Sequence, residues 1–185
     1  MISIFLISAY CLMSCHHNNS NPYWKAYHKA AALAHQNDIA LAKEGFICEA
    51  VGDGNAEIIR GISRGYALRR TKPVTIDEAR MLMVDLVERF SKPFNDEVSI
   101  RPYLRSYPFG TESLDLYIAF VDQKGEYFVT TPGIALVGNY EGRVRYFVRE
   151  SGLLKGVHFE SYETALEVVR AQQKKQNKEQ ADTPE

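Results

Sequence analysis

The segment from residue 114 to residue 149 constrains the fold most, because hydrophobic alternation and short turns follow one another there. Apolar residues occupy every second position from Leu114 to Phe120, as in a strand with one buried face. Glycine-containing turn sequences separate the strands that follow. The pattern predicts four strands in succession: 114–121, 126–131, 134–140 and 143–149. Strands joined by such short turns are antiparallel neighbours.

Three segments have the residue spacing of helices, and we expect them to pack on this sheet. They are residues 23–43, 76–92 and 162–173. Thr75 and Glu78 form a capping box, which sets the start of the second helix. Lys92 and Pro93 predict its end, since proline cannot continue a helix without losing a hydrogen bond.

Two more strands are expected before the second helix, and an edge strand is expected at 157–160. Residues 46–51 indicate a short strand, followed by a glycine turn at 52–55. Residues 56–68 fit both periodicities, but Gly61 and Gly65 favour a strand because glycine weakens a helix. The sequence therefore predicts an α+β fold, an antiparallel β-sheet meander with helices packed on one face.

The N-terminus reads as a segment that is removed. Residues 2–13 are almost wholly apolar, and the chain turns polar directly after Cys15. This run is shorter than the roughly 20 residues of a membrane-spanning helix and suits the core of a signal peptide. The expected organisation is a signal peptide at 1–14, Cys15 with a polar tether at 15–22, one domain at 23–173 and a disordered tail at 174–185.

Leu12-Met13-Ser14-Cys15 resembles the lipobox of bacterial membrane lipoproteins. The resemblance implies cleavage before Cys15 and a membrane anchor through acyl chains on that cysteine. It also implies the outer membrane rather than the inner one where two membranes are present, because His16 and not aspartate follows. Residues 79–80, 100–104 and 107–109 faintly resemble segments of an uncharacterised group of small bacterial lipoproteins, which carries over no functional residue.

Composition limits which classes of partner and cofactor the chain is expected to bind. The net charge of −1 does not predict a nucleic-acid partner. The three cysteines lack CxxC spacing, and no histidine motif suggests zinc, so we expect neither a metal nor another cofactor. Cys48 lies in an apolar run and is expected to be a buried, inert thiol.

The segment around residues 101–107 is the candidate interaction surface. Arg101, Tyr103, Arg105 and Tyr107 interleave cations with aromatic rings, a composition typical of recognition surfaces. The same residues could instead clamp a long connection onto the sheet. The basic stretch at residues 60–72, which includes Arg64, is read as a solvated strand face.

Three functional hypotheses remain open. The leading one is a lipid-anchored, non-enzymatic binding domain of the cell envelope, with an envelope protein as partner. The second is an envelope serine hydrolase, because Ser63 lies in a GxSxG pattern and Asp115 and His158 follow in the required order. The third is a soluble cytosolic α+β domain with a misread N-terminus. The sequence predicts no oligomeric state.

Overall fold

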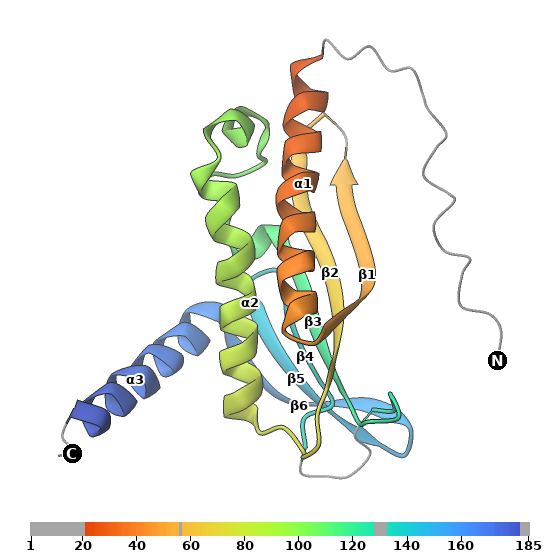
Figure 1. The fold of residues 1–185 in the computed structure, drawn as a ribbon, viewed down its shortest axis with the longest axis vertical. Helices are drawn as coiled ribbons and strands as arrows, with labels where there is room; N and C mark the ends of the chain where they lie inside the picture. The colour runs from red at the N-terminus through yellow and green to blue at the C-terminus, as the bar shows by residue number, and fades with distance from the viewer. Residues whose placement is uncertain (1–20, 56, 128–132, 182–185) are drawn as a thin grey trace.

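The computed structural model describes residues 21–55, 57–127 and 133–181. The predicted α+β class is confirmed: a six-stranded, mostly antiparallel sheet carries helices on one face. Figure 1 shows the helices in front of the sheet, with α1 and α2 side by side. Among the described helices, none is long and apolar enough to cross a bilayer.

Helix α1, Pro22–Lys43, agrees with the predicted helix. The Asn21 side chain accepts a hydrogen bond from the Tyr23 amide at 2.9 Å and caps the first turn. Gly45 ends the helical segment with a φ of +92°, a conformation that glycine adopts without strain. The buried residues of α1 recur at helical spacing and face the sheet: Tyr23, Ala26, Ala30, Ala34 and Leu41.

Strands β1, Phe46–Asn55, and β2, Ile59–Arg69, form an antiparallel pair. The strand assignment of the second segment is confirmed. The glycine turn predicted at 52–55 is wrong, because Gly52 and Gly54 continue the backbone ladder opposite Ser63 and Gly61. Glycine lowers strand propensity but does not prevent pairing when the opposite strand supplies the register.

Helix α2, Ile76–Asp96, begins at the predicted capping box, in which Thr75 and Glu78 bond to each other's backbone amides. The predicted end at Lys92 and Pro93 is wrong. Pro93 cannot donate to the Arg89 carbonyl one turn earlier. The Asn37 side chain of α1 donates to that carbonyl at 2.8 Å instead, so the helix continues through the proline.

The chain crosses over between β2 and β3, Leu114–Val121. It passes through α2 and two short 3-10 helices, η1 (Val98–Tyr103) and η2 (Thr111–Ser113). Strand β3 then pairs in parallel with β2, in a register that places Ile62 opposite Leu114. The prediction of a purely antiparallel meander is therefore wrong. The β1–β2 hairpin and the strands from β3 to β6 are joined by the parallel pairing of β2 with β3.

The second half of the sheet is a meander. Strands β4 (Leu136–Tyr140), β5 (Arg143–Glu150) and β6 (Leu153–Ser161) follow β3 in antiparallel order. The turn at Glu141 and Gly142 is confirmed, and both residues have positive φ, as tight hairpin turns require. The edge strand is longer than predicted. Most of the strand predicted at 126–131 lies outside the described residues, and the neighbour of β3 in the sheet is β4.

Helix α3, Tyr162–Ala181, packs its first half against α2 and the last strands. It extends beyond the predicted end at 173 and into the stretch predicted to be disordered. Lysine, glutamine, glutamate and alanine are all good helix formers, and Lys175 lies 3.9 Å from Glu179 one turn later. Figure 1 shows this distal half projecting away from the sheet and from α2.

Candidate functional site

The structure does not assemble the predicted hydrolase. Ser63 and Asp115 are opposite one another in the β2–β3 register, on the face of the sheet that the helices leave uncovered. His158 in β6 is paired with Tyr146 in β5, on the helix-covered face, and the two rings are tilted against one another with centroids 5.3 Å apart. Four strand spacings separate β2 from β6, roughly 19 Å at about 4.8 Å each.

The backbone around Ser63 also lacks the required geometry. A nucleophile elbow needs a sharp turn between a strand and a helix. Ser63 instead lies within the extended strand β2. Burial raises the pKa of Asp115, and a hydrogen bond from Ser63 lowers it by less. The pair is a partly buried polar contact, and the distance to His158 rules out the predicted triad of Ser63, Asp115 and His158.

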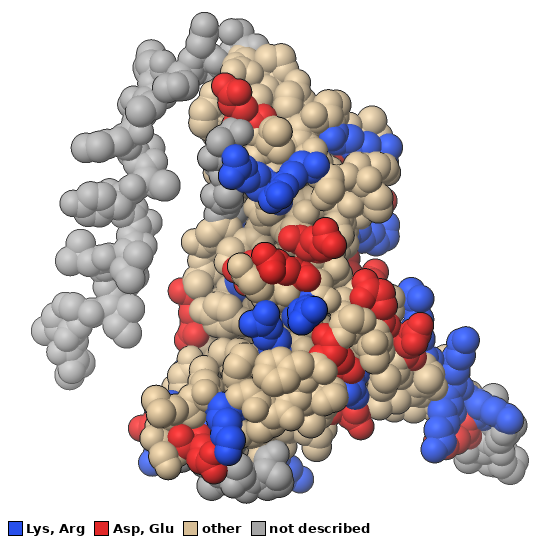
Figure 2. Space-filling model, turned by 180° about the vertical axis from the view of Figure 1, so that it is seen from behind, with Lys and Arg blue, Asp and Glu red and all other residues tan. Residues whose placement is uncertain are grey.

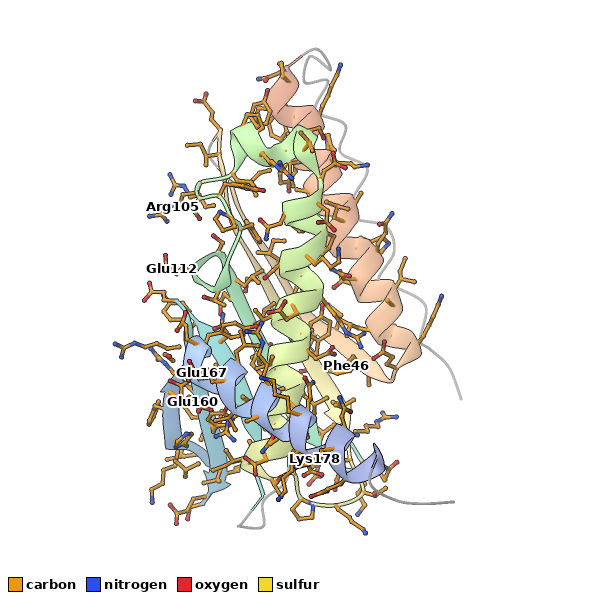
Figure 3. All side chains as sticks on the ribbon, turned by 90° about the vertical axis from the view of Figure 1, so that its left-hand side faces the viewer. Phe46, Arg105, Glu112, Glu160, Glu167 and Lys178 are labelled. Atoms are coloured by element: carbon orange, nitrogen blue, oxygen red, sulfur yellow. The ribbon has the colours of Figure 1, made fainter. Side chains whose placement is uncertain are left out.

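The predicted interaction segment divides into two parts. Arg101 donates to the Asn95 carbonyl at 2.7 Å and stacks over the Tyr107 ring at 4.9 Å. Tyr103 packs against the Tyr23 ring of α1, with centroids 6.1 Å apart. These contacts favour the clamp interpretation for Arg101 and Tyr103. Arg105 and Tyr107 remain exposed, and Figure 3 shows Arg105 at the outer edge of the connection.

Within the described part of the chain, Cys48 and the candidate metal ligands add no reactive site. Cys15 lies outside the described residues. Cys48 is exposed, contrary to the prediction of a buried thiol, because it lies on the edge strand β1. Partial burial and the charge of Asp38 raise the pKa of Cys48, which keeps the thiol protonated. Among the residues that the structure describes, no group of three or more histidine, cysteine or carboxylate side chains could hold a metal ion.

Sequence reasoning missed a buried ionic contact on the covered face of β2. Arg64 was expected on a solvated strand face but is only 3% exposed. Its Nε lies 3.4 Å from a carboxylate oxygen of Asp38 on α1, and the Tyr66 hydroxyl donates to the same carboxylate at 2.5 Å. Burial, followed by this hydrogen bond, raises the pKa of Tyr66. The contact fastens α1 to β2.

A second contact of the same kind fastens α2 to the other end of the sheet. Arg80 Nε donates to Glu160 at 2.8 Å, and the Tyr146 hydroxyl donates to the same oxygen. Burial alone would raise the pKa of Glu160, but the hydrogen bonds from Arg80 and Tyr146 outweigh it and hold the pKa below its ordinary value. The sequence held one signal for these contacts: Arg64 and Arg80 both occupy positions where the periodicity of the strand or helix calls for a buried apolar residue. Since a buried cation needs an anionic partner, such a position predicts a buried ion pair.

The uncovered face of the sheet presents the most distinctive group of exposed and half-buried side chains. We define the open-face cluster as six of the aromatic residues and arginines that β3 to β6 present on this face: Tyr117, Tyr140, Arg143, Arg145, Phe147 and Phe159. Figure 2 views the molecule from this side and shows charged side chains of both signs interspersed with uncharged ones.

Contacts within the open-face cluster order its rings without burying them. Arg145 stacks over Tyr140 at 5.6 Å, and Phe147 meets Phe159 edge to face at 6.5 Å. Tyr140 remains 46% exposed and Phe159 61% exposed. Shallow hollows of about 420 and 480 Å³ flank the cluster, one beside Tyr140 and one beside Phe159.

Glycines let the rings lie flat on the strands. A Cβ atom at Gly65 would come within 2.0 Å of the Tyr117 ring, and one at Gly156 within 2.4 Å of the Phe159 ring.

The fold and this surface define an α+β domain with one helix-covered face and one aromatic, arginine-bearing face. No family model, no curated protein and no solved structure matches the chain.

Proposed function

We propose that the chain is a lipid-anchored, non-enzymatic binding domain of the cell envelope, in the outer membrane where two membranes are present. The anchor is proposed from the sequence around Cys15, which resembles a lipobox. The binding role is proposed from the open-face cluster, with another envelope protein as the partner.

Exposure of ordered aromatic rings beside arginines is the observation that carries the binding role. Tyrosine and arginine are among the residues that contribute most energy at protein interfaces. Tyr140 and Phe159 expose large rings, while the stacked Arg145 holds one of them in place. Because these side chains are already positioned, a partner would find a surface whose ordering cost is small.

The anchor is tested by the intact mass of the protein purified from its native membranes. We expect loss of residues 1–14 and a gain of acyl mass, both abolished in Cys15→Ala and both retained in the control Cys48→Ala. A full-length, unmodified protein in the soluble fraction would contradict the anchor and favour the alternative of a soluble α+β domain.

The binding role is tested by photo-crosslinking in cells. A photoreactive phenylalanine analogue at position 159 reports on the open-face cluster, and the same analogue at position 105 reports on the exposed part of the 101–107 segment. We expect a protein adduct of one defined mass from position 159, reduced by Arg145→Ala. An adduct from position 105 alone would move the binding surface to Arg105 and Tyr107.

A further inference from the structure

A groove separates α2 from the first half of α3, on the helical side of the molecule. Its volume is about 780 Å³, within the range of small-molecule sites. The loop at residues 70–74 closes one end. This loop is fixed to the sheet, because the Arg70 amide donates to the Val121 carbonyl and the Ile134 amide to the Val74 carbonyl, both at 2.8 Å.

Aliphatic side chains form the floor of the groove. They come from both helices and are buried or half-buried: Met81, Leu82, Val84, Leu166 and Val169. A floor of this kind offers no hydrogen bonds to a ligand. Each methylene group of a ligand that the floor removes from water contributes about 0.8 kcal/mol to the free energy of binding. The floor therefore suits a hydrocarbon chain better than a polar ligand.

The carboxylates that line the groove are already engaged within the fold. Each accepts a hydrogen bond from a side chain or a capping amide: Glu78 from the Thr75 amide at 2.8 Å, Asp85 from Arg89 Nε at 2.8 Å, and Glu88 from the Tyr162 hydroxyl at 2.8 Å. The three groups keep their negative charge, but each is held in place by a donor of the fold, and Asp85 is paired with the Arg89 cation.

The three cations that line the groove form no ion pair with any carboxylate that the structure describes. Arg70 and Lys72 line it from the loop, and Arg170 lines it from α3. None of the three has a carboxylate within 4.0 Å among the described residues, although Arg70 is near enough to lower the pKa of Glu78. An anion placed among them would gain charge-assisted hydrogen bonds, with arginine offering two parallel donors.

The size of the groove argues against a peptide helix as its occupant. A helix is about 10 Å across, so 780 Å³ would hold roughly 10 Å of its length, fewer than two turns. A single alkyl chain, being much thinner, can lie along the whole floor. We propose that the α2–α3 groove binds a single-chain amphiphile of the fatty-acid class, with its carboxylate held by Arg70, Lys72 and Arg170.

This proposal does not depend on the anchor or on the open-face cluster. The test is isothermal titration calorimetry on the full-length chain with hexadecanoate below its micelle concentration. We expect one site per chain. The uncharged hexadecanol and the cationic hexadecylamine should each bind at least tenfold more weakly, since the carboxylate supplies the contacts to the three cations.

Variants locate the site. Arg70→Gln combined with Arg170→Gln should weaken hexadecanoate binding at least tenfold, whereas the matched pair Arg149→Gln and Lys178→Gln, outside the groove, should not. Leu166→Trp, which fills the floor, should weaken binding while circular dichroism stays unchanged. Equal affinity for acid and alcohol, binding insensitive to Arg70 and Arg170, or binding only to anionic vesicles or to an acidic helical peptide would overturn the proposal.

Discussion

Asn37 and Pro93 form a compensating pair at the level of single residues. Proline removes the donor for the Arg89 carbonyl, and the Asn37 amide replaces it from another helix. We expect Asn37→Ala to lower the free energy of unfolding by about 1–2 kcal/mol, because it leaves a partly buried carbonyl unsatisfied.

The compensation can be isolated by a double-mutant cycle measured by urea unfolding. Pro93→Ala restores the backbone donor, so Asn37→Ala should cost less than half as much in that background. The exposed neighbour substitution Gln36→Ala is the control and should be near neutral in both backgrounds. An equal cost of Asn37→Ala with and without Pro93 would contradict the pairing.

Glu160 makes stability depend on pH. Its pKa is depressed in the folded state, so the folded state gains stability from the ionised carboxylate above the ordinary glutamate pKa. That contribution is lost as the pH falls from the ordinary pKa, about 4.3, toward the depressed one.

We expect the wild-type protein to lose more stability than Glu160→Gln as the pH falls from about 5 through the ordinary glutamate pKa toward the depressed folded one. The measurement is urea unfolding at successive pH values, and the slopes are compared rather than the absolute stabilities. Glu163→Gln, an exposed position on α3, should leave the wild-type slope unchanged. Parallel curves for wild type and Glu160→Gln would show that the carboxylate is not preferentially ionised in the folded state.

At the scale of elements, α3 has two halves with different roles. Ala165 and Val169 are buried against the fold, whereas the described residues after 173 are exposed. A chain ending at Gln173 should therefore match the full chain in unfolding free energy to within about 0.5 kcal/mol. Val169→Ala should cost about 1–3 kcal/mol. Thermal unfolding checks both, and a large loss on truncation would mean that the distal half packs on the domain.

Local signals predicted the elements, and contacts between distant elements explain the errors. The capping box at Thr75 and the turn at Glu141 depend on neighbouring residues alone, so the sequence reveals them. The continuation of α2 depends on Asn37, which no local pattern connects to Pro93. Alternation likewise identifies β2 and β3 as strands, but it does not say that they pair in parallel.

The candidate sites were likewise predictable only where their residues are neighbours in the sequence. Residues 101–107 stood out because their aromatic residues and arginines are contiguous in sequence. The open-face cluster is assembled from four strands, so Tyr140 and Phe159 become neighbours of arginines only through strand register. The groove between α2 and α3 depends on how two helices diverge, which the hydrophobic stripe of either helix does not reveal.

At the scale of the whole molecule, the start of α1 and the proposed groove lie at opposite ends. Helix α1 has 22 residues and spans about 33 Å. It begins at the top of the molecule in Figure 1, while α2 begins at the bottom, beside the loop that closes the groove. Under the proposed anchor, the lipid would join the chain ahead of α1, and the groove would lie toward the end of the domain far from the start of that helix.

The parallel joint between β2 and β3 has a consequence for folding kinetics. The β1–β2 hairpin and the β3–β6 meander each form from residues close in sequence, but the joint closes a loop that includes all of α2. Since loop closure carries an entropic cost before its contacts form, we expect the joint to form late. In stopped-flow experiments Ile62→Val should mainly accelerate unfolding, whereas Val144→Ala in the meander should mainly slow folding.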